Sequence, residues 1–347
     1  MVDAGATAVD STTRAETLGE ASMVRRLSAE FLGTLLLVAV GTGAATVLAL
    51  GPAERIDELA RGDALQDVPA QQTTFNQIFA NSLGDILPVA MAFAIALAVL
   101  VYALGGVSGG HFNPAVTFAL ASVRRFRWVE VPMYWIAQIA GGIAGAFVVY
   151  GIYGDRAAAV TTSVPGVDPA TGQPTGQSTD VVTNIWFGAT RVAENVEIWQ
   201  ALLAEALITF ILVTAIMAIA VDPRAPKGWS GLIIGLALAG GILVTAQATG
   251  GSANFARSLG PFVASLVYDV SDIPWGDLVV YAAGPLIGAV AAAFIYEGIT
   301  GLERVSPAPS PGAATPEPEA LLDEVDEPGG GVSESPATTK KTPPPSV

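Results

Sequence analysis

The chain has 347 residues, of which 52% are hydrophobic and 14% are charged, and its mean hydropathy is +0.54. This composition predicts an integral membrane protein and excludes an ordinary water-soluble domain. The absence of cysteine and the presence of one histidine, His111, exclude disulfides and metal sites built from several thiolates or imidazoles, and the net charge of −15 argues against nucleic acid as a partner. No pattern typical of a catalytic or cofactor site is present, so we expect a protein that is not an enzyme.

Residues 1–24 have no apolar face and are predicted to form a disordered tail. Arg25 and Arg26 then precede an apolar segment that contains Glu30. A twin-arginine signal peptide is the alternative interpretation, but the segment is long and lacks a convincing small-residue cleavage site. We therefore predict a permanent membrane helix at this position.

Six segments are apolar enough to cross a bilayer as helices, which takes about 20 residues each. They lie at 27–50, 86–106, 131–153, 199–221, 229–248 and 278–299. Each is long enough to span the hydrocarbon layer. The chain is therefore predicted to be a multi-pass, all-α membrane protein.

Basic residues mark the cytoplasmic side of membrane proteins. They gather before the first apolar segment, after the second, and between the fourth and fifth, at Arg25, Arg26, Arg124, Arg125, Arg127, Arg224 and Lys227. Both termini are thus predicted to be cytoplasmic. The acidic insertion at 51–85 and the Thr-, Gly- and Pro-rich loop at 154–197 then lie outside, and the acidic, Pro-rich end at 302–347 is predicted to be disordered.

Two polar segments interrupt the apolar pattern. Gly109–Val116 follows the second apolar segment and Gly250–Arg257 the fifth, with the glycine pair, Asn and Ala at the same offsets. Asn113 and Asn254 are good helix N-caps and Pro114 suits a first helical position, so each segment predicts a loop that becomes a short helix. Polar backbone at membrane depth is tolerated only inside protein or beside water. We therefore favour one shared site near the bilayer midplane over two helix caps in unrelated loops.

The interruptions belong to a larger internal repeat. Glu30 and Glu205 begin similar sequences in the first and fourth apolar segments, and the third and sixth segments end in Ala- and Gly-rich stretches that close with Tyr150 and Tyr296. Glycine pairs one turn apart should permit close helix crossings. These pairs are Gly141/Gly145, Gly231/Gly235 and Gly284/Gly288.

The repeat predicts a transmembrane domain at 25–301 made of two halves of opposite orientation. The first half is 27–153 and the second is 199–300. Each half should hold three transmembrane helices and one re-entrant half-helix.

The sequence Ser108–Thr117, Ser-Gly-Gly-His-Phe-Asn-Pro-Ala-Val-Thr, resembles the first signature of the major intrinsic proteins, the family of aquaporins and glycerol facilitators. The resemblance covers roughly 27–300. It implies six tilted helices and two half-helices around one pore per subunit, usually in a homotetramer. It also implies a passive channel of the cell membrane that conducts water, with small neutral solutes as further candidates, and that excludes ions and protons.

The second motif departs from the family pattern. The family usually has Asn-Pro-Ala-Arg, whereas this chain has Asn254-Phe255-Ala256-Arg257. The proline that prepares the first helical turn is replaced by a bulky residue with an N–H donor. Two interpretations follow: a local packing change beside an open pore, which we favour, or a narrowed lumen.

The resemblance assigns the pore centre to the two capped motifs. Asn113 and Asn254 would donate from their side-chain amides to passing water. The positive ends of the two half-helices would disfavour protons and cations. The motif residues at this centre are Asn113, Pro114, Ala115, Asn254, Phe255 and Ala256.

The family's outer constriction maps onto Arg257 by its motif and onto Phe93, Ile242 and Gly251 by spacing alone. A buried arginine is costly unless it faces water or a partner, so a lumen-facing role is favoured over a salt bridge to an outer-loop acid. This constriction resembles neither strict water channels nor glycerol facilitators of the family. It is closer to vacuolar plant members that pass water and ammonia, while Ser258 favours water.

Four further polar residues are predicted to support or line the pore. We interpret Glu30 and Glu205 as acceptors for N–H groups of the re-entrant loops, with a proton relay as the alternative. His111 is expected to line or brace the inner vestibule, and Gln138 to join helices.

The leading hypothesis is a passive water channel. The alternative within the same class is a facilitator of ammonia, urea or glycerol. Two other classes stay open: an ion-coupled secondary transporter that uses Glu30 and Glu205, and a non-conducting membrane scaffold, suggested by Phe255 and the long outer loops.

Overall fold

A computed structural model describes residues 21–61, 70–167 and 174–302, with side chains described at 21–50, 86–159 and 185–302. These residues belong to one compact unit within Met1–Pro307. The terminal segments predicted to be disordered lie outside the described residues, except for residues 21–24 and Leu302. Met23 and Val24 already belong to helix α2.

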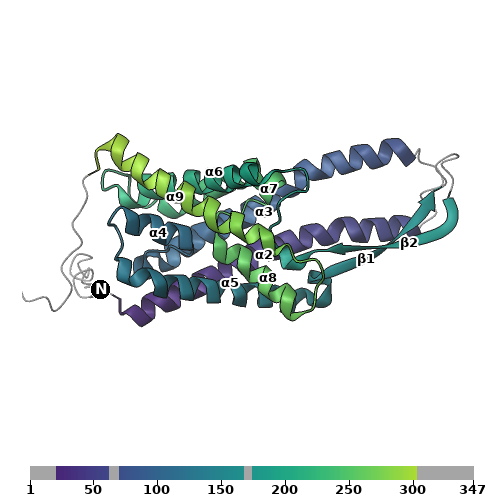
Figure 1. The fold of residues 1–347 in the computed structure, drawn as a ribbon, viewed down its shortest axis with the longest axis horizontal. Helices are drawn as coiled ribbons and strands as arrows, with labels where there is room; N and C mark the ends of the chain where they lie inside the picture. Colours follow the sequence, from purple (N-terminus) through teal and green to yellow (C-terminus); the bar gives the residue numbers. More distant parts are fainter. Residues whose placement is uncertain (1–20, 62–69, 168–173, 303–347) are drawn as a thin grey trace, which may run out of the picture. The chain divides into compact units, whose positions relative to one another are not determined.

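Six long helices form the body of the protein (Figure 1). They are α2 (Met23–Arg61), α3 (Ala70–Ser108), α5 (Val131–Tyr153), α6 (Ile198–Ile216), α7 (Ser230–Thr249) and α9 (Leu278–Thr300). Apolar stretches long enough to cross a membrane occur at Met23–Leu50, Ile86–Ser108, Trp128–Ala157, Ile198–Val221, Ser230–Thr249 and Trp275–Thr300. The six predicted spans are thus confirmed to within a few residues at most ends.

Two half-helices begin at the predicted asparagines. Helix α4 (Pro114–Ser122) is capped by Asn113 and helix α8 (Phe255–Val267) by Asn254. Each is too short to cross a bilayer, and each is largely buried. The predicted fold of six membrane helices with two re-entrant half-helices is confirmed.

Two of the segments that connect membrane helices contain more regular secondary structure than the sequence predicts. Helix α2 continues past its apolar span to Arg61, and α3 begins at Ala70, within the segment interpreted as a polar insertion. The segment interpreted as a loop contains an antiparallel hairpin, β1 (Ala159–Val167) and β2 (Pro174–Asn184), which pairs Ala159 with Asn184. Both strands are rich in Thr and Val, which fit a pleated strand.

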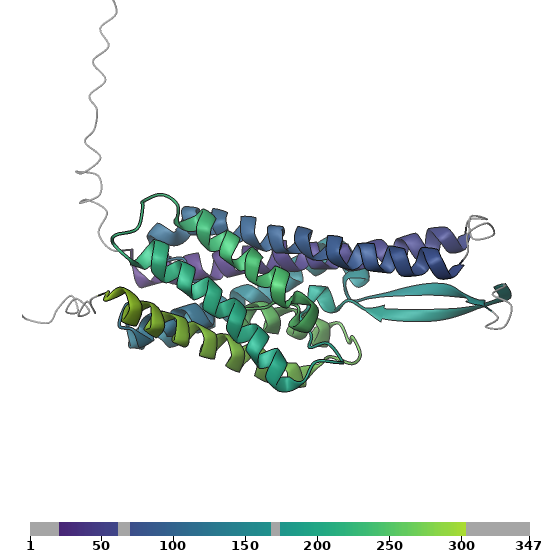
Figure 2. The same cartoon turned by 90° about the horizontal axis from the view of Figure 1, so that it is seen from above.

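The hairpin lies beside the extended end of α2 in both views (Figures 1 and 2), and β1 contacts α2. We call this the hairpin end of the bundle. The opposite end, where α2 begins at Met23 and α9 ends at Thr300, is the terminal end.

Helix packing repeats in the two halves. Helix α2 packs on α5 just as α6 packs on α9, and α3 and α7 pack on each other across the halves. The half-helices are exchanged, because α4 contacts α9 and α8 contacts α5. The predicted glycines lie at these crossings: a side chain at Gly145 would strike the Leu35 carbonyl, and one at Gly288 the Ala206 carbonyl.

The outer surface of the helices is apolar. Each long helix exposes large aliphatic side chains, among them Leu36, Ile95, Ile136, Leu203, Val244 and Ile287. Exposed aliphatic residues on every helix are typical of a surface that contacts lipid. The protein is therefore a multi-pass membrane protein whose polar groups are gathered inside.

Five further short helical segments lie between or at the ends of these elements in the described part of the chain. The 3-10 turns η3 (Gly154–Ala157), η4 (Trp186–Gly188) and η6 (Trp275–Asp277) lie at the hairpin end, and η2 (Trp128–Glu130) precedes α5. Helix α6 ends in a π-helical turn, η5 (Met217–Val221). Such turns shift the face that a helix presents, and Ala220 and Val221 here face the internal cavity described below.

Candidate functional site

The two re-entrant segments have nearly identical backbones. Gly109 and Gly110 have φ of 94° and 67°, and Gly250 and Gly251 have φ of 79° and 61°. These left-handed conformations are readily adopted by glycine, which explains the matching pairs in the sequence. Two residues later Phe112 (φ 48°) and Ala253 (φ 55°) occupy the same region, at a steric cost that the surrounding contacts must offset.

The asparagines join the two segments reciprocally. Asn113 Oδ1 accepts from the Ala115 N–H at 2.9 Å, and its Nδ2 donates to the Ala253 carbonyl at 2.7 Å. Asn254 Oδ1 accepts from the N–H groups of Ala256 and Arg257, and its Nδ2 donates to the Phe112 carbonyl at 2.8 Å. Both half-helix N-termini are therefore held at one point in the protein.

The Glu30 carboxylate holds the first segment. Its Oε1 accepts from Ser108 Oγ at 2.6 Å and from the His111 N–H at 3.0 Å. Its Oε2 accepts from the Phe112 N–H at 2.7 Å and from Gln138 Nε2 at 2.8 Å. Glu30 is fully buried, so these donors replace the water that an ionised carboxylate would otherwise require.

The Glu205 carboxylate holds the second segment in the same way. Its Oε1 accepts from Thr249 Oγ1 at 2.6 Å and from the Ser252 N–H at 2.9 Å, and its Oε2 accepts from the Ala253 N–H at 2.8 Å. Both carboxylates thus accept from loop N–H groups, the arrangement that the sequence analysis favoured over a proton relay.

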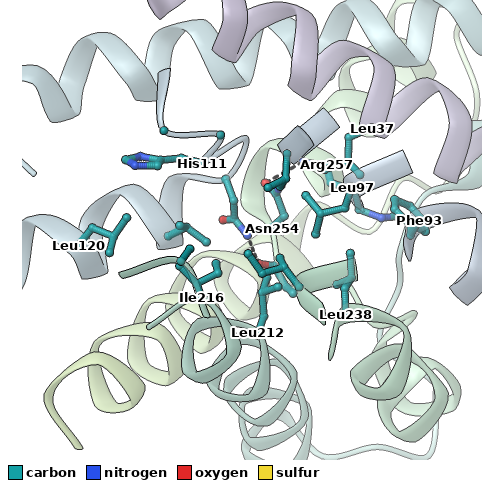
Figure 3. A pocket seen from close by; sticks show the side chains of 18 of the residues that line it. Leu37, Phe93, Leu97, His111, Leu120, Leu212, Ile216, Leu238, Asn254 and Arg257 are labelled. Carbon is teal, nitrogen blue, oxygen red and sulfur yellow. Dashed lines mark hydrogen bonds between the residues drawn. The ribbon is translucent and has the colours of Figure 1, made fainter. Parts of the chain in front are cut away.

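A cavity of about 330 Å³ runs beside the asparagines. Figure 3 shows Asn254 between His111 on one side and Arg257 with Phe93 on the other. Leucines and other aliphatic side chains form most of the wall, including Leu37, Leu97, Leu120, Leu212, Ile216 and Leu238. The wall is therefore mostly apolar, with a few polar groups set into it.

Arg257 and Phe93 form the polar and aromatic parts of the wall toward the hairpin end. Arg257 Cζ lies 5.0 Å from the centroid of the Phe93 ring, and Nη1 donates to the Gly188 carbonyl at 3.2 Å. Arg257 is only 3% exposed, and among the described residues no carboxylate forms an ion pair with it. The alternative of a salt bridge to a loop acid therefore has no counterpart in the described part of the chain.

The other predicted constriction residues, Ile242 and Gly251, lie next to each other. Both are buried, and a Cβ at Gly251 would lie 3.2 Å from Ile242 Cα. Neither is among the residues that line the cavity. The motif residues Pro114, Ala115, Phe255 and Ala256 also lie outside the lining, and Phe255 is half-buried at the first position of α8.

His111 lines the cavity toward the terminal end. Its Nδ1 lies 3.1 Å from Thr117 Oγ1, and its ring packs against Phe126 and Tyr134. Gln138 lies outside the lining and bridges Glu30 to Thr117 Oγ1, the latter at 2.9 Å. No cluster of potential metal ligands occurs among the described residues, and His111 has hydrogen-bonding and aromatic neighbours instead.

Charged groups also frame the terminal end. Arg125 lines the cavity, and its Nη2 lies 3.5 Å from Glu297 Oε1. In the turn between α6 and α7, Arg224 donates from its side chain and its backbone to Asp222. These hydrogen bonds hold the pKa of Asp222 well below its usual range and raise that of Arg224.

Sequence reasoning missed several residues that shape the site. Gly188 supplies the carbonyl that accepts from Arg257, and Gly41 leaves room for the Phe93 ring. Thr190 Oγ1 lies 2.8 Å from Ser258 Oγ. Gly188 and Thr190 follow the hairpin in a segment without periodicity, so no pattern in the sequence signals that it returns to the site.

Comparisons with known proteins agree with this geometry. The family model described as "Major intrinsic protein" matches residues 17–296. The "Aquaporin AqpM" of Methanothermobacter marburgensis is 36% identical over 281 residues, which cover 80% of this chain and 98% of that protein. The "Probable aquaporin AqpM" of Archaeoglobus fulgidus is 35% identical over 277 residues, covering 79% and 96%.

A solved structure shares the fold. The aquaglyceroporin from Plasmodium falciparum superimposes with a TM-score of 0.57 at 22% identity, covering 80% of this chain and 97% of that one. The family match includes both capped segments, both buried glutamates and Arg257. The chain therefore belongs to the major intrinsic protein family, a family of membrane channels and not of enzymes.

Proposed function

We propose that this protein is a passive water channel that also admits small neutral solutes and excludes ions and protons. The observation that carries the proposal is the reciprocal pairing of Asn113 and Asn254 beside the cavity. Each side-chain amide has two N–H donors, and one of them is used on the opposite segment. The second is available to a molecule in the cavity, so two fixed donors would orient each passing water.

Exclusion of cations is expected to be electrostatic. The N-termini of α4 and α8 meet at the asparagines, and each carries partial positive charge. In aquaporin-type pores such half-helix ends, together with an arginine, oppose protons and cations. In this chain the arginine is Arg257, which lines the cavity.

The geometry of the glutamates disfavours ion-coupled transport. Each carboxylate oxygen of Glu30 and Glu205 already accepts from donors of its own re-entrant segment. A coupling group would have to release these donors during each cycle. We therefore assign both residues a supporting role.

We further propose that Phe255 is a packing substitution beside an open lumen, and that Phe93, Ile242, Gly251 and Arg257 set the solute range. We also propose a homotetramer in the cell membrane with both termini cytoplasmic. Arg125 and Arg224 lie at the terminal end, beside Glu297 and Thr300 of α9, and support this orientation. The apolar outer face leaves room for both lipid and neighbouring subunits.

The test is stopped-flow light scattering on liposomes that contain the purified protein. Shrinkage in sucrose measures water flow, and re-swelling in urea, glycerol or an ammonium gradient measures solute flow. We expect faster shrinkage than in protein-free liposomes, with no dependence on proton or sodium gradients. Solute flow without water flow would make the protein a facilitator, and neither would favour a scaffold.

Arg257→Ala tests the filter within the same assay. Loss of bulk and fixed charge should raise the glycerol-to-water permeability ratio about tenfold, equivalent to ~1.4 kcal/mol, and should increase proton leakage. Arg191→Ala is the matched control, because Arg191 is half-exposed and packs on Trp186 instead of facing the cavity. Unchanged selectivity in Arg257→Ala would place Arg257 outside the filter.

A further inference from the structure

The two re-entrant segments end in hydroxyl residues, Thr117 and Ser258, and these hydroxyls have different hydrogen-bond partners. In the first segment, Thr117 Oγ1 lies against His111 and accepts from Gln138 Nε2 at 2.9 Å. Gln138 belongs to α5, a membrane helix, and donates to Glu30 as well. A single membrane-helix side chain thus joins the carboxylate to the half-helix.

The second segment has no such side chain. Tyr134 of α5 and Tyr281 of α9 are equivalent, since their hydroxyls donate to the Ser108 and Thr249 carbonyls at 2.8 and 2.7 Å. One turn after Tyr134 comes Gln138, whereas one turn after Tyr281 comes Pro285, which has no side-chain donor. The position of Gln138 is therefore vacant in the second half of the repeat.

In the second segment, Thr190 contacts Ser258 as Gln138 contacts Thr117 in the first, but it comes from a loop and not from a membrane helix. It lies in the segment that returns from the hairpin, is 1% exposed, and brings Oγ1 to 2.8 Å from Ser258 Oγ. Ser258 occupies the place in α8 that Thr117 occupies in α4. The side-chain methyl of Thr190 also packs against Gly250. Two independent contacts thus fix Thr190 on the second segment.

The hydroxyls of the second segment form a continuous chain. Thr190 Oγ1 pairs with Ser258 Oγ and also with the Tyr281 side chain of α9, and Ser258 Oγ lies 2.6 Å from Ser252 Oγ. Ser252 Oγ in turn donates to the Asn254 carbonyl at 2.9 Å and accepts from the Asn254 N–H at 3.3 Å. The chain ends on the main chain of the asparagine at the cavity, and Ser252 itself lines the cavity.

We propose that Thr190 is a positioning residue of this channel: through Ser258 and Ser252 it fixes the main chain of Asn254. The loop after the hairpin thus supports the second segment through Thr190, whereas helix α5 supports the first through Gln138. The effect on conduction rests on the proposed function, whereas the effect on the segment does not. Solute discrimination is therefore sensitive to this loop.

Matched substitutions test the proposal. Thr190→Val keeps the shape and the methyl contact with Gly250 but removes the hydroxyl, and Thr190→Ser keeps the hydroxyl. Ser258→Ala removes the next member of the chain. Thr46→Val is the control, because the Thr46 side chain is buried and its hydroxyl has no hydrogen-bond partner among the described residues.

Two readouts are compared, namely amide hydrogen exchange by mass spectrometry and stopped-flow permeability of liposomes. We expect Thr190→Val to raise exchange in Thr249–Ser258 but not in Ser108–Thr117, with Gln138→Leu giving the opposite pattern. Water permeability should change about threefold to fivefold relative to that for glycerol, as for the loss of one hydrogen bond. Thr190→Ser should restore both values, and adding Ser258→Ala to Thr190→Val should have little further effect.

The proposal is overturned if Thr190→Val behaves like Thr46→Val in both readouts, if both segments loosen equally, or if Thr190→Ser behaves like Thr190→Val. Should Thr190→Val fail to fold, Ser258→Ala decides by the same criteria. A wild-type protein that conducts nothing would defeat the proposed function alone, because the exchange pattern still decides the role of Thr190.

Discussion

The first re-entrant segment, Ser108–Thr117, and the second, Thr249–Ser258, have the same backbone and cap but different supports. Glu30 accepts from four donors, one of them Gln138, whereas Glu205 accepts from three among the described residues. The segment with fewer donors is the one that leads into Arg257 and contacts the loop after the hairpin. The two halves thus keep one backbone shape, while the second adds contacts with the loop after the hairpin.

The largest expected effect distinguishes the two carboxylates. In Glu30→Gln and Glu205→Gln an amide N–H₂ faces donors that need an acceptor, which should cost on the order of 3 kcal/mol in stability. Glu30→Gln should be the more damaging, because it affects four donors instead of three. Thermal unfolding in detergent would measure this order.

Glu194→Gln is the control for those variants, because the Glu194 side chain is 94% exposed. It should leave the melting temperature unchanged. Equal melting temperatures for the two buried variants, or the reverse order, would show that the number of donors does not set the difference between the segments.

A smaller effect on permeability and stability is expected at Phe255, where the first motif has Pro114. Phe255→Pro should change water permeability less than about twofold and stability by no more than about 1 kcal/mol, since proline suits the first position of a helix. The Asn254 side chain accepts from Ala256 and Arg257 but not from Phe255, so no cap hydrogen bond is lost. Stopped-flow shrinkage and thermal unfolding measure the two quantities.

The converse substitution can be made in the first motif. Pro114→Phe would make the first motif resemble the second and should likewise be mild. A tenfold gain of water flow in Phe255→Pro would instead show that the phenyl ring obstructs the lumen, and the packing interpretation would have to be abandoned.

The smallest effect is expected at Asp222, in the turn at the terminal end. Among the described residues, Asp222 forms no hydrogen bond with either re-entrant segment. The low pKa of Asp222 in the folded protein means that its ion pair with Arg224 stabilises the fold above the ordinary carboxyl pKa of about 3.9. This contribution should be constant from pH 7 to 5 and be lost as the pH falls through the native pKa. The difference in melting temperature between wild type and Asp222→Asn should therefore shrink only in acid, whereas a difference that grows in acid would contradict it.

Sequence patterns predicted the membrane helices and the capped segments because those features depend on local chemistry. Apolar length specifies a span, and Asn113 with Pro114 specifies a helix start. The hairpin, the Gly188 carbonyl and Thr190 depend on where a loop without periodicity returns in space. Ile242 and Gly251 were placed by spacing alone, and spacing does not say whether a residue faces the cavity or packs behind it.

The most direct test of the central claim is the osmotic water permeability of liposomes with purified wild-type protein, together with its activation energy. We predict a higher permeability and a lower activation energy than in protein-free liposomes, because water would move between fixed donors at Asn113 and Asn254 instead of dissolving in lipid. A permeability and activation energy equal to those of protein-free liposomes would contradict the account.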